Sequence, residues 1–366
     1  MKGSVRASIL DAMRRAVSSD GGRERLFGAG DRLVIGLSGG ADSVTLSVLL
    51  PDAAREFGAE VVALAHLNHG LRPGAEDDQR FCGEFAAGLG LPFETETADV
   101  GALARERRTS IEDAGRIARY AFLRRVMASR AATRIAVAHT RNDQAETVLL
   151  RLFRGAGPKG LASIYPKAGP VIRPLLDVRR AAIEAFVAAE GIPFRDDPTN
   201  RDVTFARNRV RHELLPYLAR YAGDGVVDVL ARQAAIARED ADWLEQAATE
   251  SARSLVLEEE TGVSIDAAGL RQLHPALARR VVHAVLTRTA GRRFIGFDHV
   301  DAVLRLAGAA VPVGVGPGGM REVIDLPGLR VKHIRGRLCF EPRPPDPGRA
   351  GRRRGRPRGP SSGGRL

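Results

Sequence analysis

Apolar runs alternate with helical periodicity over the first two thirds of the chain. Continuous apolar stretches predict buried strands at 33–37, 61–65 and 134–139, with a shorter strand near 93–97. The spacing of apolar residues between and around them predicts helices at about 4–17, from about 43, and at 77–88, 111–128, 144–153 and 181–190. Strands that are apolar throughout and separated by helices indicate an α/β fold with a doubly wound, mostly parallel sheet.

The pattern changes after residue 222. A long helix is expected at about 225–253, two more within 265–288, and a hairpin-like pair of strands within 323–341. We therefore predict an N-terminal catalytic domain at 1–222 and a second, mainly helical smaller domain at 223–342. The Arg/Pro/Gly-rich stretch 343–366 is predicted to be a disordered basic tail.

The charge of the chain suggests a polyanionic partner, but its distribution weakens that suggestion. The net charge is +12, and the tail contributes +7 of it through eight arginines and one acid, Asp346. The tail is interpreted as a solubilising extension, and the excess of arginine over lysine as a compositional bias. Because no apolar run reaches the ~18 residues of a membrane span, we expect a cytoplasmic protein that does not bind a membrane.

The stretch SGGADS follows the first predicted strand and resembles a phosphate-binding loop without its lysine. Backbone amides at Gly39 and Gly40 and the hydroxyls of Ser38 and Ser43 suit an anion, but Ala41 and Asp42 stand where a Walker loop has Gly-Lys. A carboxylate beside phosphates repels them unless a hard cation lies between. We therefore predict ATP phosphates at 38–43 with Mg²⁺ at Asp42; the alternative is that Asp42 is only a favourable charge at a helix start.

Two more polar clusters end predicted strands at the same sheet edge, HLNHGLR (66–72) and AHTRNDQAET (138–147). Asp143 and Glu146 lie at i and i+3 beside His139, suited to hold an amine and accept its proton, or simply to form an acidic first helical turn. Other candidates, each with a purely structural alternative, are the strand-end His69, the helical stripe Glu112, Arg116 and Arg119, and the polar group Arg207, Asn208 and Arg211.

Taken in order, these strings resemble the tRNA(Ile)-lysidine synthetase family of the PP-loop, or N-type ATP pyrophosphatase, superfamily over about residues 30–215. They include S-x-E-x-x-x-R-x-x-R-Y (110–120), RPLL (173–176) and F-A-R-N-R-V-R (205–211). The resemblance implies an adenine nucleotide α-hydrolase-like fold and a carbon–nitrogen ligase. It implies that ATP adenylates the wobble cytidine of a CAU-anticodon tRNA(Ile), releasing pyrophosphate, and that free L-lysine then displaces AMP to give lysidine.

With this resemblance we assign roles to the candidate residues. The catalytic set is Asp42, Asp143, Glu146 and Arg116, and His69 joins the loop 38–43 in binding ATP. The set for tRNA and lysine is Glu112, Arg119, His139, Arg207, Asn208 and Arg211. The partners are the tRNA and lysine, with a homodimer left open.

Two positions depart from the family pattern, and three rival functions remain. Asn142 stands where the family usually has an aspartate, so no base is expected there, and Gly115 replaces a helical alanine. A tRNA-thiolating relative normally needs paired cysteines, whereas Cys82 and Cys339 lie far apart. The other rivals are an amide-forming ligase of a small metabolite and a non-catalytic RNA-binding protein.

Overall fold

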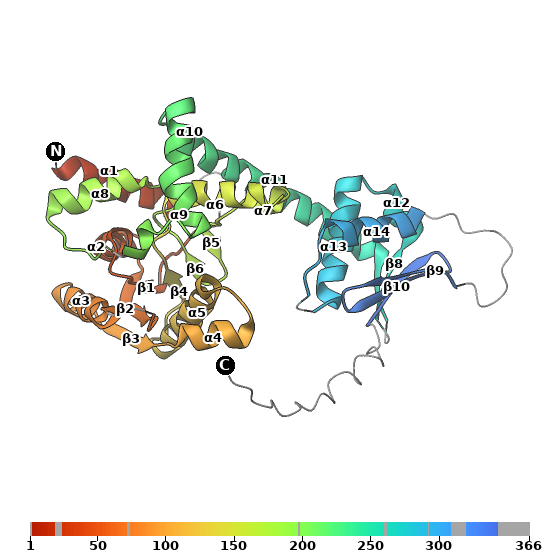
Figure 1. Cartoon of the computed structure of the whole chain (residues 1–366), viewed down its shortest axis with the longest axis horizontal. Helices are drawn as coiled ribbons and strands as arrows, with labels where there is room; N and C mark the ends of the chain where they lie inside the picture. Colours follow the sequence, from red (N-terminus) through yellow and green to blue (C-terminus); the bar gives the residue numbers. More distant parts are fainter. Residues whose placement is uncertain are drawn as a thin grey trace, which may run out of the picture. The chain divides into compact units, whose positions relative to one another are not determined.

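The computed structural model describes residues 2–18, 24–71, 74–196, 198–259, 262–291, 293–308 and 320–342. It divides into two compact units, Met1–Asp240 and Ala241–Leu366, each with its own hydrophobic core (Figure 1). The predicted disordered tail at 343–366 lies outside the described residues. Within those residues, no helix is both long and apolar enough to cross a membrane.

The first unit is built on a six-stranded sheet in the order β3-β2-β1-β4-β6-β5. Its strands are β1 (Arg32–Gly36), β2 (Glu60–Asn68), β3 (Phe93–Thr97), β4 (Arg134–Ala136), β5 (Lys167–Ala168) and β6 (Val171–Ile172). All neighbouring pairs are parallel except β5 with β6. The predicted doubly wound, mostly parallel sheet is confirmed, whereas the two-residue strands β5 and β6 were not predicted.

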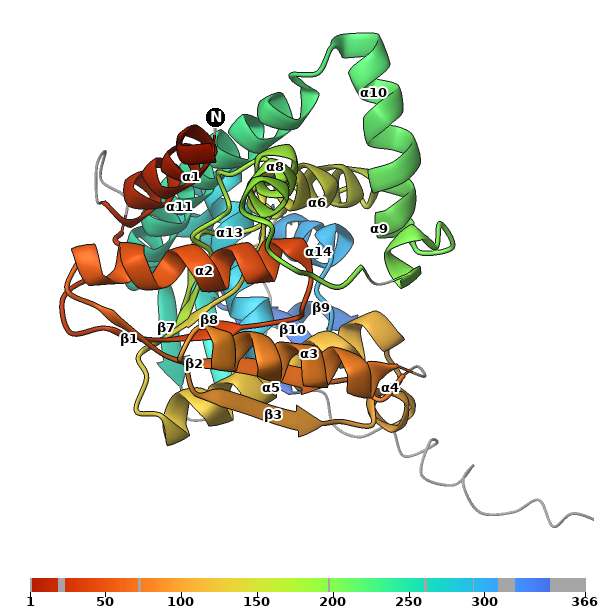
Figure 2. The same ribbon diagram turned by 90° about the vertical axis from the view of Figure 1, so that its left-hand side faces the viewer.

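Helices cover both faces of this sheet, which explains why β1 is apolar from Leu33 to Ile35. One face carries α1 (Lys2–Val17), α2 (Ala41–Glu56), α3 (Ala75–Gly88) and α8 (Arg180–Glu190). The other carries α4 (Val100–Arg107) and α5 (Ile111–Ser129), and Figure 2 shows α2 and α5 on opposite sides of β1. Leu33 and Ile35 pack against the helices of the first face and Val34 against α5 on the other face, and all three are fully buried.

Strand order places the switch point of the sheet between β1 and β4. The chain runs outward from β1 through β2 to β3 on one side, and from β4 to β6 and β5 on the other. Loops that leave the carboxyl ends of β1 and β4 therefore diverge and leave a crevice, the usual ligand position in such sheets. The helix that follows β4 is α6 (Arg141–Phe153), and α7 (Pro158–Leu161) comes next.

The segment after α8 returns to the same edge. It contains a 3₁₀ turn, η1 (Pro198–Arg201), then α9 (Ala206–Arg209), a π-helical turn, η2 (Val210–Leu214), and α10 (Leu215–Ala222). The last three follow one another without a break, and both α9 and η2 pack against α6 (Figures 1 and 2). A π-helical turn is rare and occurs often at functional sites.

The second unit contains the predicted helices but a larger sheet than predicted. The three predicted helices are α11 (Val226–Leu255), which begins in the first unit, α12 (Ala267–Gln272) and α13 (Pro275–Thr289), whereas α14 (Phe297–Gly308) was not predicted. Five antiparallel strands pair in the order β7-β8-β11-β10-β9: β7 (Val256–Glu259), β8 (Gly262–Asp266), β9 (Met320–Leu326), β10 (Leu329–Ile334) and β11 (Arg337–Pro342). The compact units divide inside α11, whereas the predicted boundary at 222 lies before this helix begins.

Replacing Gly115 by alanine should stabilise the protein. Gly115 lies inside α5, and an added Cβ would meet Val100 and His69 at 3.7 Å, which is ordinary van der Waals contact. Because glycine costs about 1 kcal/mol relative to alanine in a helix, Gly115→Ala should raise the free energy of unfolding by about 0.5–1 kcal/mol. Urea denaturation measures this as a higher midpoint at unchanged slope.

The control for this substitution is Gly39→Ala, because Gly39 has φ +84°, where a side chain is strained. That variant should be less stable than the wild type. Equal loss of stability in both variants would contradict the reasoning.

Candidate active site

The loop after β1 leads directly into α2, and its backbone is shaped for an anion. Gly39 takes the left-handed conformation, with φ +84°. Gly40 is the N-cap of α2 and supplies no side-chain hydrogen bond, so the first amides of the helix remain suited to an anion. The hydroxyls of Ser38 and Ser43 lie 3.1 Å apart, and the Ser38 amide donates to Ser43 Oγ at 3.1 Å. This geometry fits the predicted phosphate loop at 38–43.

The negative charge of Asp42, in the first turn of α2, is only weakly compensated by neighbouring groups. Within the described part of the chain its Oδ1 is buried without a hydrogen-bond partner, and its Oδ2 accepts a long hydrogen bond of 3.5 Å from Arg180 Nη2. Burial raises the pKa of Asp42 to about 6, against the opposing effect of Arg180 and with a further contribution from the charge of Asp143. A carboxylate in this environment gains strongly from an added cation.

Asp143 and Glu146 form a buried acidic pair on the first turns of α6. Their exposed fractions are 6% and 0%. Asp143 closes a capping box with Thr140: its Oδ2 accepts from the Thr140 amide at 2.7 Å and from the Thr140 hydroxyl at 2.8 Å. Its Oδ1 points to arginines instead, so one carboxylate both caps the helix and enters the site.

Two arginines from α9 and η2 neutralise this acidic pair. Arg207 donates from Nε to Glu146 Oε2 and from Nη2 to Asp143 Oδ1, both at 2.8 Å. Arg211, one helical turn later, donates from Nε to Glu146 Oε1 at 2.6 Å and from Nη2 to Oε2 at 3.0 Å. The predicted members of the two motifs thus meet across more than sixty residues of sequence.

Arg180, at the start of α8, joins the phosphate loop to the acidic pair. Its guanidinium lies 3.5 Å from Asp42, 3.4 Å from Asp143 and 3.6 Å from Glu146. Asn142, on α6, holds the start of α8 in place, because its Oδ1 accepts a hydrogen bond from the Arg180 amide at 2.9 Å. The side chain at position 142 therefore has a structural partner.

The protonation states differ sharply within this cluster. Burial alone would raise the pKa of Asp143, but the charges of Arg207 and Arg180 and the hydrogen bond from Thr140 outweigh it and hold that pKa below its usual range. Burial lowers the pKa of His139 to about 3, and Arg173 Nε donates to its Nδ1 at 3.3 Å. His139 is therefore a neutral imidazole at physiological pH, and Asp143 is a charged carboxylate that accepts a proton poorly.

His69 follows the end of β2, and the helical stripe Glu112, Arg116 and Arg119 belongs to α5. Arg119 Nη2 lies 3.2 Å from His69 Nε2, and burial lowers the pKa of His69 to about 4. Arg116 is 5.0 Å from the centre of the Tyr120 ring, and its charge contributes to the low pKa of His139. Glu112 is exposed at the first turn of α5. His69, Arg116 and Arg119 thus lie at the site edge.

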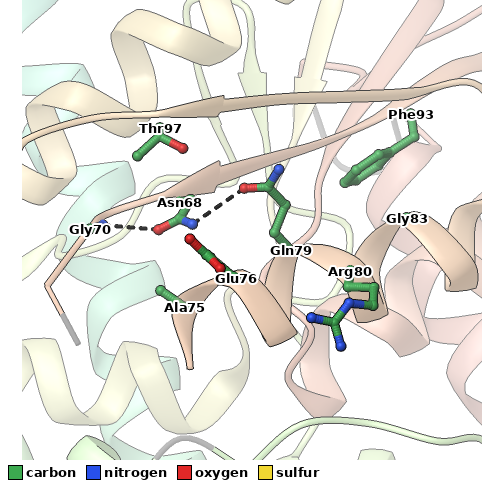
Figure 3. Close-up of a pocket in the computed structure, with 9 residues that line it drawn as sticks. All are labelled: Asn68, Gly70, Ala75, Glu76, Gln79, Arg80, Gly83, Phe93 and Thr97. Carbon is green, nitrogen blue, oxygen red and sulfur yellow. Dashed lines mark hydrogen bonds between the residues drawn. The ribbon is translucent and has the colours of Figure 1, made fainter. Parts of the chain in front are cut away.

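A polar cavity of 740 Å³ lies beside His69, between α3 and the ends of β2 and β3 (Figure 3). Asn68 donates to Gln79 Oε1 at 3.3 Å and accepts from the Gly70 amide at 2.9 Å, so it fixes the turn that carries His69. No predicted site residue lines the cavity. The contacts of Asn68 at the cavity wall hold the turn that carries His69.

Asn208 has a structural role. Its side chain is buried, and Nδ2 donates to the backbone oxygens of Thr199 and Asp202, each at 2.8 Å. Of the two interpretations that the sequence left open for this residue, the polar network describes its contacts.

The sequence reasoning missed two cations of the site, Arg173 and Arg180. Arg173 is the first residue of the motif RPLL at 173–176, and Arg180 follows the motif. The motif was recognised as a string but not as a source of site residues. Their contacts with His139 and Asp42 are tertiary, so spacing within the motif gave no signal of them.

Comparison with known proteins agrees with this geometry. A family model described as a PP-loop domain matches residues 22–218. The tRNA(Ile)-lysidine synthase of Geobacter sulfurreducens is 42% identical over 312 residues, which are 84% of this chain and 66% of that protein. The one from Leifsonia xyli subsp. xyli is 38% identical over 315 residues, 86% of this chain and 90% of that protein. The chain therefore spans about two thirds of the first relative and most of the second.

A solved structure shares the fold. The U34-tRNA thiolase NcsA from Methanococcus maripaludis, with its 4Fe-4S cluster, aligns with a TM-score of 0.54 at 17% identity, over 65% of this chain and 80% of that one. At this identity the likeness concerns the fold alone. The match to the PP-loop model and the identity to the synthases, over most of the chain, show that the chain belongs to the PP-loop family and, within it, to the tRNA(Ile)-lysidine synthase family.

Proposed function

We propose that this chain forms lysidine on tRNA(Ile) in two steps. ATP first adenylates the carbonyl oxygen of the wobble cytidine of the CAU anticodon and releases pyrophosphate. The ε-amine of free L-lysine then attacks the activated ring carbon, and AMP leaves. The observation that carries the proposal is Arg180, whose guanidinium lies within 3.6 Å of the loop carboxylate Asp42 and of both members of the acidic pair.

The residues supply alignment and charge for the first step. Backbone amides at the start of α2 and the hydroxyls of Ser38 and Ser43 bind the phosphates, and Arg180 stands next to them. Fixed cations and dipoles that face the developing charge are the largest source of rate in such transfers. Arg207 and Arg211 add two further positive charges, at Asp143 and Glu146.

The donor set around Asp42 fits a bound Mg²⁺. One carboxylate oxygen is buried without a partner, and the described residues hold no group of three or more histidine, cysteine or acidic side chains that could enclose a metal by themselves. Mg²⁺ commonly takes one or two carboxylates and completes its shell with phosphate oxygens and water. Bound there, it would neutralise charge between Asp42 and the phosphates.

The acidic pair divides the work of the second step. Asp143 stays ionised, because its pKa is held below the usual range, and it therefore binds the lysine ammonium and does not take up its proton. We assign proton acceptance to Glu146 once the entering amine has displaced Arg207 or Arg211, which engage its two oxygens before lysine binds. The amine must therefore replace at least one arginine contact when it enters.

Thiolation is a weaker proposal for this chain. Burial, with the nearby charge of Asp78, raises the pKa of Cys82 to about 12, so its thiol is far from the reactive thiolate form. Cys339 belongs to β11 in the other unit. The chain thus offers no pair of reactive cysteines to carry sulfur.

Transfer of labelled lysine tests the proposed function directly. The protein, ATP, Mg²⁺ and tRNA(Ile) with a CAU anticodon should incorporate lysine into RNA, with release of equimolar AMP and pyrophosphate. The same tRNA with uridine in place of the wobble cytidine is the control and should stay unlabelled. Absence of label from the cytidine-bearing tRNA, with a correctly folded protein, would refute the proposal.

Asp42→Asn should make the protein more stable at pH 7 and nearly inactive. The folded pKa of Asp42 is raised from 3.8 to about 6, so the folded state holds the proton more tightly and wild-type stability falls as pH rises through that window. At about 1.36 kcal/mol per pKa unit, the variant should gain at most ~3 kcal/mol at pH 7 relative to the wild type, and nothing at pH 3. Urea unfolding at both pH values measures this.

The same variant tests the Mg²⁺ assignment. ATP with Mg²⁺ should raise the melting temperature of the wild type more than that of Asp42→Asn, and lysine transfer should fall by about 10²-fold or more. Near-normal transfer by the variant would remove Asp42 from the mechanism.

Substituting the adjacent residues Arg180 and Arg179 in turn distinguishes a specific positioning role of Arg180 from a general effect of positive charge. Arg180→Ala removes the cation shared by Asp42, Asp143 and Glu146, so kcat for lysine transfer should fall by about 10²-fold with a smaller change in KM for ATP. Arg179→Ala is the matched control, because Arg179 forms its ion pair with Asp228 instead. Equal losses in both variants would show that Arg180 has no special place in the site.

A further inference from the structure

A groove of 1010 Å³ is lined by the helices that build the acidic site, and on α6 it begins with Leu150, one helical turn after Glu146. Its lining residues belong to α6 on one side and to α9, η2 and α10 on the other. The apolar part of its lining includes Leu150 and Phe153 of α6, Val210 and Leu214 of η2, and Tyr217 of α10. The function assigned to the acidic pair uses none of these residues.

The segment α9–η2 presents two different sets of arginines to its two sides. Arg207 and Arg211 are engaged with Asp143 and Glu146. Arg209 lies between them in sequence, is exposed and lines the groove. Arg154, from the end of α6, and Arg220, from α10, line the groove as well and are also exposed. With the described residues, none of these three forms an ion pair.

Two large aromatic rings lie in the groove and remain open to solvent. Phe153 is 67% exposed and Tyr217 is 56% exposed. Leaving such rings in water is costly, so an exposed aromatic pair within an apolar groove marks a binding surface. Glu213 is the one acid among the lining residues, against the three arginines.

We propose that this groove binds unpaired nucleotides of the substrate RNA, next to the base that enters the active site. Aromatic rings offer stacking surfaces for bases, and unpaired arginines around them contact the phosphates of the same strand. A second copy of the chain fits less well, because a symmetric contact through this groove would bring the same three arginines of both copies together. The proposal rests on the proposed function, since it takes the RNA of that reaction as its ligand.

The position of the groove explains how binding and chemistry are linked. The helices that line it also carry Asp143, Glu146, Arg207 and Arg211, and on α6 Leu150 follows Glu146 by one helical turn. Nucleotides bound in the groove would therefore contact the same helices that carry Arg207 and Arg211, the arginines that lysine must displace. A strand that crosses from the groove to the crevice would bring one base to the site and keep its neighbours stacked outside.

Direct RNA binding, without ATP or lysine, tests the groove. Fluorescence anisotropy of a labelled CAU anticodon stem-loop should show Tyr217→Ala binding roughly 5- to 150-fold more weakly, the effect of one lost stacked base, and Tyr217→Phe binding normally. Arg209→Ala should lower the slope of log affinity against log salt by roughly 0.7, and Arg209→Lys should keep it. Arg107→Ala, an exposed arginine on α4 outside the groove, is the matched control and should bind like the wild type.

The outcomes separate the groove from the reaction. If the variants lose RNA affinity while the wild type transfers no lysine, the groove stands and the proposed function falls. If the wild type transfers lysine but Tyr217→Ala and Phe153→Ala bind RNA normally, the groove proposal alone is overturned. A wild-type dimer that Tyr217→Ala dissociates at unchanged RNA affinity would likewise overturn it, because the occupant would then be a second copy.

Discussion

Two buried carboxylates, Asp143 and Glu146, constrain the arrangement of the helices around the switch point. Burying an unpaired carboxylate costs several kcal/mol, so the pair is tolerable only with cations in good geometry. Those cations come from elsewhere in the chain, Arg180 on α8 and Arg207 and Arg211 on α9 and η2. The requirement fixes three helices from distant parts of the sequence around one point. The crevice that the strand order creates is thereby turned into a site.

The sequence predicted what depends on local pattern. Strand β1 is apolar because both of its faces are buried, and SGGADS after it is a local turn into a helix, so both were recognisable. Arg180 was not, because its contact with Asp42 spans 138 residues and no local period records it. Strands β7 and β8 were missed for a similar reason: each is short, and β8 is stabilised through its pairing with β11, far along the chain.

Asp143 shows why the two interpretations of its motif were hard to separate from sequence. An acidic residue three positions after Thr140 is favoured by helix capping alone, and the capping box is present. Yet capping uses only Oδ2, while Oδ1 meets Arg207. One carboxylate therefore serves both purposes, and neither interpretation excludes the other. The neighbouring Asn142 performs the remaining structural task, since its oxygen accepts from the start of α8, and an amide does that as well as a carboxylate.

Asp42 and Asp143 share a cation in Arg180, and yet their pKa values move in opposite directions. Asp143 has two close arginines and a cap, so its charge is compensated before any ligand arrives. Asp42 has one long contact and a buried oxygen without a partner, so its charge is incompletely compensated. A phosphate alone would add repulsion at Asp42, whereas a phosphate with a divalent cation would relieve its burial penalty. The imbalance between the two carboxylates therefore supports the proposal of a metal-bound triphosphate on the side of α2 and of the amine on the side of α6.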